Sequence, residues 1–581
     1  MKRTLSVLFG LWLFVSAQAQ AEEYHLAIAR QPVNITGQTV DKITINGTIP
    51  GPTLRFNEGE EAIIHVTNHM KEDTSVHWHG LILPGGMDGV PGMNGFPGIR
   101  PGETFTYRFK LKQAGTYWYH AHSMGQEQDG HYGSMIITPK GKDPVQADRD
   151  YIVLLSDFTD EKSGKIMSNL KMSSEYYQYA RRTIGDFFED ANERGFGKAW
   201  EDAKMWGEMR MMPTDLSDVS GYTFLVNGKT PEQNWTGLFK PGERVRLRFI
   251  NASAMSIYDV RIPGLTMQVV QADGQNVEPV TVDEFRFGVA ETYDVIVTPK
   301  EDKPYTIAAE PIDRTGFALG TLAPREGMRG EIPAQRPRAL LTMADMGMDH
   351  DGMSHDMPMD HNMTGTDHAA MGHDMSSMDD IPGMESGWAK AGTPPEDKAL
   401  SYADLRYLGS QKDTRAPERE ILVTLGGNME RYIWTINGKK FADSGPINLK
   451  YGERVRLKFV NETMMAHPMH LHGMFVQLEN GQPAEKLPNK HTVIVPPGQS
   501  YSVLLTADQP GEWAFHCHLL FHMMSGMMNK VVVAQLDPAA MPPKKKASPH
   551  QGHSMPKVEM DHSQMDHTKH QPAAEGAHHA H

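Results

Sequence analysis

The sequence predicts an all-β protein made of three homologous β-sandwich domains, and two observations lead to this prediction. A chain of 581 residues is too long to fold around a single hydrophobic core, so several domains are expected. One pattern also occurs three times, at residues 45–68, 226–251 and 436–461: an Asn-Gly turn, a Gly-Glu pair, and alternating polar and apolar residues that end at Asn. Such alternation is typical of half-buried strands, and short strands between Gly/Pro turns are typical of β-sandwiches. The copies lie much further apart than solenoid repeats.

The N-terminal segment has the features of a signal peptide. Lys2 and Arg3 precede an apolar run at 5–15, and the small-x-small pattern of 17–19 follows. We therefore expect residues 1–21 to be a signal peptide of the Sec type and the mature protein to be exported. No later apolar run is long enough to span a membrane. The formal net charge of −15 argues against a nucleic-acid partner.

The three domains are expected at 22–142, 148–335 and 398–537. The middle domain is interrupted at about 160–220, where the spacing at 186–204 indicates a partly helical insertion. An ungapped alignment of the middle and last copies sets Ile257, Val260 and Ile262 against His467, His470 and His472. We therefore expect the middle domain to lack these histidines, which are candidate metal ligands, and to act as a spacer or scaffold.

Two segments are too polar and too repetitive to form a core. The linker, expected at 340–395, contains 11 Met and 5 His within 343–384, and the tail at 542–581 is also rich in His and Met. We expect both to be disordered. These segments either capture copper or are solvated linkers without a function. Because thioethers prefer Cu(I) to hard cations, we favour copper capture. The insertion adds four methionines that either line a substrate site or pack: Met205, Met209, Met211 and Met212.

Four short motifs contain the residues with metal chemistry. They are 77–79 and 120–122 near the N-terminus, and 467–472 and 516–522 near the C-terminus, with a methionine at 527. On a strand, residues i and i+2 point to one face, so each His-x-His pair presents two imidazoles together. Four such pairs from two domains can enclose a cluster of metal ions.

Cys517, the single cysteine of the chain, lies between two of these histidines and points to the opposite face. Together with His467, His522 and Met527 it supplies a thiolate, two imidazoles and a weak thioether ligand. This set is diagnostic of a blue-copper electron-transfer centre. A tetrahedral zinc site needs neither eight paired imidazoles nor a thioether, so we regard zinc as the weaker alternative.

These motifs resemble those of the multicopper oxidases, the group that includes laccases and ascorbate oxidase. The resemblance covers the mature chain and implies three cupredoxin-like Greek-key domains. Within the group, the chain is most similar to the bacterial copper-resistance protein A subfamily. The segments that carry this closer similarity are 79–84, 87–92, 272–275 and 290–297, together with the Met-rich linker.

The resemblance implies four copper ions as cofactors. The type 1 copper would be held by His467, Cys517, His522 and Met527. The type 2 copper would be held by His77 and His470. The type 3 pair would be held by His79, His120, His122, His472, His516 and His518.

Electrons would pass from Cys517 to His516 and His518, and Asp88 would be either a proton relay or an ordinary turn residue. Subfamily members often carry a Glu between the positions of His522 and Met527, and this chain has none there. Further copper ions would bind loosely to the Met/His-rich segments.

These features favour a periplasmic bacterial enzyme that oxidises Cu(I) and reduces dioxygen to water, for copper resistance. One alternative is a laccase-like oxidase of phenols, and another is a copper-sequestering protein whose oxidase activity is incidental. We expect a monomer, with other periplasmic copper-binding proteins as possible partners.

Overall fold

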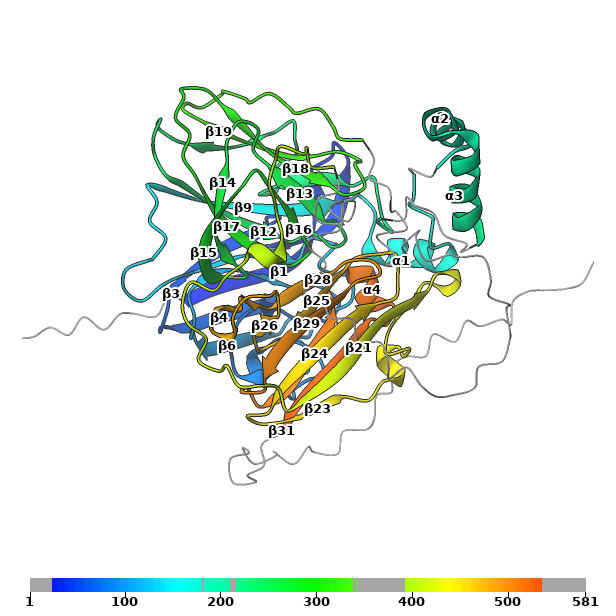
Figure 1. Cartoon of the computed structure of the whole chain (residues 1–581). Helices are drawn as coiled ribbons and strands as arrows, with labels where there is room; N and C mark the ends of the chain where they lie inside the picture. The colour runs from blue at the N-terminus through cyan, green and yellow to red at the C-terminus, as the bar shows by residue number, and fades with distance from the viewer. Residues whose placement is uncertain (1–22, 180–181, 209–215, 338–340, 342–391, 535–581) are drawn as a thin grey trace, which may run out of the picture. The chain divides into compact units, whose positions relative to one another are not determined.

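The computed structural model describes residues 23–179, 182–208, 216–337, 341 and 392–534. Three pairs of β-sheets follow one another along this part of the chain (Figure 1). None of its helices combines the length and apolar character needed to cross a membrane. The predicted all-β fold is confirmed, whereas the predicted signal peptide, the tail and nearly all of the Met-rich linker lie outside the described residues.

The first domain consists of two four-stranded sheets. One has the order β2 (Thr39–Ile45), β1 (Glu23–Asn34), β4 (Glu61–Asn68) and β6 (Thr104–Lys110). The other has the order β3 (Gly51–Asn57), β8 (Tyr132–Thr138), β7 (Gly115–His120) and β5 (His77–His79). Every second residue of β4 is buried, as the alternating sequence predicts. The antiparallel pairing of β5 with β7 places His77 opposite His120.

The middle domain consists of two six-stranded sheets. One has the order β10 (Thr223–Val226), β9 (Arg149–Phe158), β12 (Val245–Asn251), β17 (Thr292–Val297), β14 (Met267–Ala272) and β15 (Gln275–Val282). The other has the order β11 (Trp235–Leu238), β19 (Ala318–Ala323), β18 (Tyr305–Pro311), β13 (Tyr258–Arg261), β16 (Glu284–Phe287) and β20 (Ala399–Leu400). Strand β20 follows the Met-rich linker in sequence and pairs in parallel with β16.

The last domain consists of a six-stranded and a five-stranded sheet. The first has the order β22 (Ile433–Ile436), β21 (Arg419–Asn428), β24 (Arg454–Asn461), β29 (Ser500–Thr506), β26 (Val476–Leu478) and β27 (Asn489–Lys490). The second has the order β23 (Ile447–Lys450), β31 (Met528–Ala534), β30 (Gly511–Cys517), β25 (His467–Leu471) and β28 (Thr492–Val495). Strands β25 and β30 pair antiparallel, which places His470 opposite His516.

The insertion in the middle domain is helical, as predicted. It contains α1 (Ser163–Met172), α2 (Ile184–Arg194) and α3 (Phe196–Glu208), and α2 and α3 lie side by side (Figure 1). Gly195 separates the last two helices, because its φ of 89° lies in a region that non-glycine residues rarely adopt. A fourth α-helix of the described residues, α4 (Leu520–Met524), follows β30 in the last domain.

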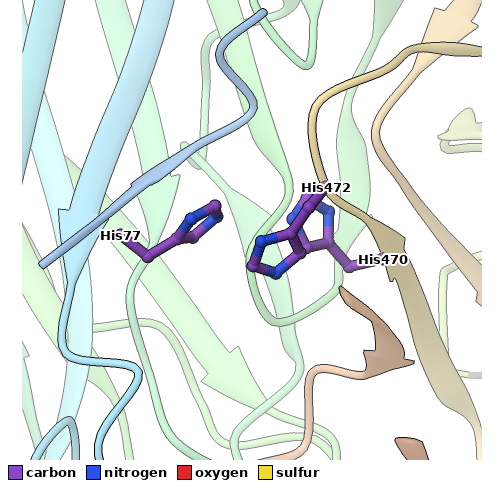
Figure 2. A group of neighbouring side chains, drawn as sticks. All are labelled: His77, His470 and His472. Atoms are coloured by element: carbon purple, nitrogen blue, oxygen red, sulfur yellow. The ribbon is translucent and has the colours of Figure 1, made fainter. Parts of the chain in front are cut away.

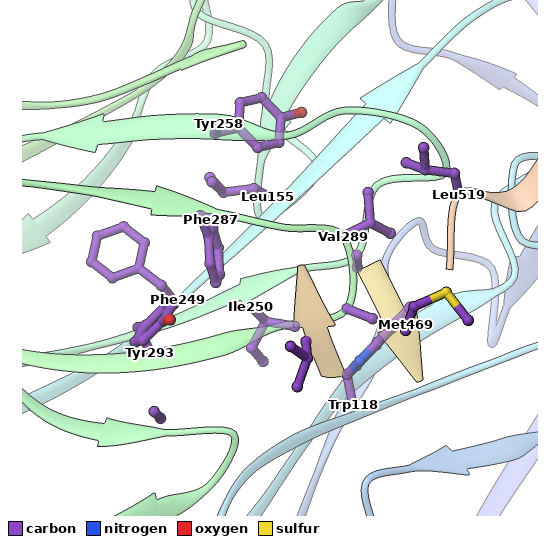
Figure 3. Close-up of a cluster of buried hydrophobic side chains, with 14 of the residues drawn as sticks. Trp118, Leu155, Phe249, Ile250, Tyr258, Phe287, Val289, Tyr293, Met469 and Leu519 are labelled. Carbon is purple, nitrogen blue, oxygen red and sulfur yellow. The ribbon is translucent and has the colours of Figure 1, made fainter. Parts of the chain in front are cut away.

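One buried apolar cluster runs through all three domains (Figure 3). It includes Trp118 of the first domain, Phe249 and Tyr258 of the middle domain, and Met469 and Leu519 of the last domain. Because burial of apolar area is the main stabilising term in folding, this shared core holds the domains in a defined relation. The interface between the first and last domains is therefore fixed well enough to form a site.

Candidate metal centre

The eight histidines of the His-x-His pairs gather at the interface between the first and last domains. Among the groups of three whose ring nitrogens all lie within 4.8 Å of one another, three consist of these histidines alone. These three groups are His77 with His470 and His472, His79 with His120 and His518, and His122 with His472 and His516. Figure 2 shows the first of them, in which His77 comes from β5 and faces two histidines of the last domain.

Hydrogen bonds fix which ring nitrogen of these histidines points into the cluster. Nδ1 of His77 donates to the Asp88 carbonyl at 2.8 Å, and Nδ1 of His470 donates to the His491 carbonyl at 2.7 Å. Nδ1 of His516 likewise donates to the Cys517 carbonyl at 2.9 Å. Because a carbonyl only accepts, each Nε2 carries the lone pair that a metal needs.

Five of the eight histidines have a ring nitrogen that is buried without a hydrogen-bond partner among the described residues. Nε2 of His77, His120, His470 and His518 is buried without a hydrogen-bond partner, as are both ring nitrogens of His79. Burial lowers the pKa of His79, His120 and His470 well below the ordinary value, and neighbouring imidazoles lower it further. Neutral imidazoles with convergent lone pairs are suitable ligands for a cation such as copper.

Two carboxylates contact the outer side of this histidine set. Asp88 Oδ2 lies 2.8 Å from Nδ1 of His472, and its Oδ1 lies 3.4 Å from Nδ1 of His77. Asp88 therefore contacts one histidine from each domain. Glu127 Oε2 lies 2.8 Å from Nδ1 of His120, and burial raises the pKa of the Glu127 carboxyl well above its ordinary value. Metal-ligating histidines commonly have such partners, which orient the imidazole and increase its basicity.

A second pocket lies on the other side of β30. Sγ of Cys517 lies 3.6 Å from Nδ1 of His467 and 3.8 Å from Nδ1 of His522, and all three residues are buried. Burial raises the pKa of the Cys517 thiol well above its ordinary value, so a thiolate here needs a cation beside it. Met527 is also buried, and its carbonyl accepts from the Cys517 amide at 3.1 Å. The donor set of this pocket fits copper.

The histidines of this pocket are oriented from outside. Nε2 of His522 donates to Asp218 Oδ2 at 2.7 Å, which leaves its Nδ1 facing Cys517. Asp218 also accepts from the Tyr432 hydroxyl at 2.7 Å, and burial raises the pKa of its carboxyl to about 7. The indole of Trp434 stacks on the His522 ring with centroids 3.8 Å apart.

The ten predicted histidine ligands and Cys517 thus gather in two groups that adjacent residues of β30 connect, and Met527 is buried beside Cys517 in the sense that its carbonyl accepts from the Cys517 amide. Sequence spacing does not reveal Asp218 or His491, because Asp218 lies 304 residues from His522 and His491 is remote in sequence from His79. Glu127 does have a local indication in the sequence. It lies in a run of polar and acidic residues that follows the second His-x-His motif. The insertion of the middle domain provides Asp218, a contact that fits the scaffold alternative of the prediction.

The methionines of the insertion are only partly described. Met205 of α3 is half-buried and packs against the apolar cluster that contains Trp206, which favours packing as its role. Met209, Met211 and Met212 lie outside the described residues.

This fold and these two sites define a class, the copper-dependent oxidases built from cupredoxin-like domains. Models of the multicopper oxidase family match residues 27–142, 149–325 and 414–537. The chain belongs to the multicopper oxidase family and is an enzyme, a copper-dependent oxidase.

Individual relatives agree with this assignment. The chain is 48% identical to copper resistance protein A of Escherichia coli, over 90% of this chain and 96% of the relative. It is also 48% identical to a copper resistance protein A homolog of Pseudomonas syringae pv. tomato, over 88% of this chain and 92% of the relative. The structure of Fet3p, a multicopper oxidase that functions in iron import, is similar in fold, with a TM-score of 0.63 at 20% identity, covering 88% of this chain and 90% of that one.

Proposed function

We propose that this protein is a periplasmic cuprous oxidase that serves copper resistance. Four Cu(I) ions are oxidised to Cu(II) while one dioxygen and four protons become two water molecules. The observation that carries the proposal is the pair of buried sites: a His467–Cys517–His522 pocket joined through adjacent residues of one strand to eight convergent imidazoles.

Four bound copper ions would supply the one-electron storage and the oxygen chemistry. The pocket of His467, Cys517, His522 and Met527 would hold the type 1 ion. His77 and His470 would hold the type 2 ion. The type 3 pair would be held by His79, His120 and His518 on one side and by His122, His472 and His516 on the other, which matches the geometric groups.

The protein itself supplies connection, orientation and proton delivery. Cys517 is bonded through the backbone to His516 and His518, so a short covalent path joins the two sites. Asp88, buried between His77 and His472, is the proposed proton relay. Its Oδ1 has no hydrogen-bond partner among the described residues, so it is free to accept a hydrogen bond.

Cu(I) is the proposed substrate because three methionines lie in or beside α4, the helix that carries His522. Met523 and Met524 follow His522 in α4 and are partly buried. Met167 of α1 reaches the same place, since its Sδ accepts from the Ser525 hydroxyl at 3.6 Å. Thioethers select Cu(I) over hard cations. The Met-rich linker would add capture capacity and hold extra copper loosely.

The burial of His522 argues against phenols as the main substrate. His522 and Asp218 are both at most 1% exposed, so the imidazole edge does not meet solvent. A phenol would have to displace protein to reach it, whereas a metal ion delivered by thioethers would not. A laccase-like activity is therefore the second candidate, and copper sequestration without turnover is the third.

Oxygen uptake separates these candidates. The full chain and a variant that lacks 343–384 would be supplied with Cu(I) or with a phenol, and oxygen consumption would be recorded. We expect one dioxygen per four Cu(I), with the deletion slowing Cu(I) oxidation and sparing phenol oxidation. Equal loss on both substrates, or faster turnover of phenol than of Cu(I) by the full chain, would contradict the cuprous oxidase proposal.

A Cys517→Ser variant in a copper-sensitive strain tests sequestration. The variant retains the Met/His-rich segments but lacks the thiolate. We expect copper tolerance to fall to that of a strain without the protein. Full tolerance would show that sequestration, and not oxidation, protects the cell. Export and a monomeric state are also part of the proposal, and cell fractionation and light scattering test them.

A further inference from the structure

His79 differs from the other histidines of the cluster. Of the ten predicted histidine ligands, all in the described part of the chain, only His79 has both ring nitrogens buried without a partner. One nitrogen is needed for the group with His120 and His518. The second ring nitrogen of His79 then carries the N–H group. In a metal-ligating histidine this N–H ordinarily donates to an acceptor. The acceptor for this N–H has to come from a neighbouring residue.

His491 supplies such an acceptor. One ring nitrogen of His491 lies within 4.8 Å of nitrogens of His79 and His470, and the centroids of the His491 and His79 rings are 4.7 Å apart. Nε2 of His491 is buried and has no partner among the described residues. His470 Nε2 is also unpartnered, but it is the nitrogen assigned to the type 2 copper. His491 Nε2 is therefore the acceptor left for His79.

The orientation of His491 is set by the middle domain. Its Nδ1 lies 3.5 Å from Asp273 Oδ2 and 3.1 Å from the Thr492 hydroxyl. Asp273 Oδ2 also accepts from the backbone amides of His491 and Thr492 at 3.0 and 3.1 Å. We assign the His491 proton to Nδ1, which lies beside the Asp273 carboxylate, and this assignment leaves the lone pair on Nε2.

Asp273 itself lies in a tight turn between β14 and β15. Asp273 and Gly274 have φ values of 48° and 71°, as in a type I′ hairpin turn. Gly274 packs against Tyr117 of β7, where a Cβ would lie 2.5 Å from the ring. Lys490 Nζ lies 3.2 Å from Asp273 Oδ2 and 2.7 Å from Glu291 Oε1. All three domains thus meet at this turn, so the position of Asp273 depends on their assembly.

We propose that His491, held by Asp273 of the middle domain, is a positioning residue of the trinuclear centre that accepts the free N–H of His79 directly or through one bridging water. The ring nitrogens of His79 and His491 lie within 4.8 Å of each other, and one water molecule can bridge them where they are too far apart for a direct hydrogen bond. The middle domain would then orient a type 3 ligand although it provides none. This inference rests on the proposed copper cluster.

The test compares His491→Leu, His491→Gln and Asp273→Asn with the wild type. Copper content, the absorption of the coupled type 3 pair and the paramagnetic signal of the type 2 ion are measured during titration with a chelator. We expect His491→Leu to weaken retention of cluster copper ~10- to 100-fold, as for other outer partners of metal ligands. His491→Gln retains an acceptor and should recover most of that loss. The blue absorption of the type 1 site should persist, which shows that the variants are folded.

Asp259→Asn is the matched control for Asp273→Asn. Asp259 is a buried carboxylate of the middle domain that pairs with Arg286 and Arg314 of the same domain at 2.7 and 2.6 Å. We expect this variant to lower thermal stability and to leave cluster copper in place. Wild-type retention in His491→Leu, or equal copper loss in Asp273→Asn and Asp259→Asn, would overturn the inference. A wild-type protein without a coupled pair would instead refute the proposed function.

Discussion

Gly80 is the position at which a small substitution should have a large and calculable effect. It directly follows His79 and has a φ of 82°. A Cβ at this position would lie 2.5 Å from Cδ2 and 2.7 Å from Nε2 of His491, and 3.1 Å from Cδ1 of Tyr117. Gly80→Ala therefore changes both the backbone conformational energy and the packing beside the cluster.

The two contributions can be added. A left-handed backbone costs a non-glycine residue about 1–2 kcal/mol. Overpacking of a well-packed site costs about 1–3 kcal/mol more. Both neighbouring rings are buried, so neither can move into solvent. We expect Gly80→Ala to lower the free energy of unfolding by ~2–5 kcal/mol, the sum of these two ranges.

Gly59→Ala separates the two contributions. Gly59 has a φ of 90°, and a Cβ there would meet nothing within 4 Å. In this control the free energy of unfolding should fall only by the backbone contribution, ~1–2 kcal/mol. Urea titration and calorimetry of the copper-free proteins measure both variants, and chelator titration of the copper-loaded proteins follows the cluster. Equal losses of stability in the two variants, or unchanged copper retention in Gly80→Ala, would refute the packing argument.

Four further predictions follow from the same structure. Met527→Leu removes a weak donor that favours Cu(II), so the type 1 reduction potential should rise in a redox titration; no change would exclude an axial role. Asp88→Asn removes the carboxylate beside His472, and retention of cluster copper should weaken ~10-fold or more in a chelator titration, while the type 1 absorption stays. Asp413 has a pKa held well below its ordinary value, chiefly by the Arg415 side chain. Because the pKa is lower in the folded state, the ionised Asp413 carboxylate stabilises the fold at pH values above its pKa in the unfolded chain, near 3.8. Asp413→Asn should therefore lower the free energy of unfolding by ~1 kcal/mol at pH 7 in urea titrations. The difference in unfolding free energy between variant and wild type should shrink as the pH falls below 3.8. Removal of copper by chelation should lower the thermal midpoint, and restored copper should recover it, because ligands that bind only the folded state stabilise it.

Local patterns account for the part of the site that the sequence predicts. A His-x-His pair needs only the period of a strand to place two imidazoles on one face, and Cys517 needs only to lie between such a pair to face the other way. The three repeats predict the β-sandwich domains for the same reason, because alternation along a strand is a local property. The candidate ligand set and the fold class were therefore accessible without coordinates.

Only the tertiary structure decides how these residues are partnered. Asp218 and His522 are 304 residues apart, and Asp273 and His491 are 218 apart, so no spacing in the sequence relates them. Burial of apolar surface joins the domains and so brings these residues together. Each contact then satisfies a buried N–H group, which needs a hydrogen-bond acceptor. The sequence by itself predicted which residues are candidate copper ligands. The packing of the three domains decided which nitrogen each histidine presents and which carboxylates orient it.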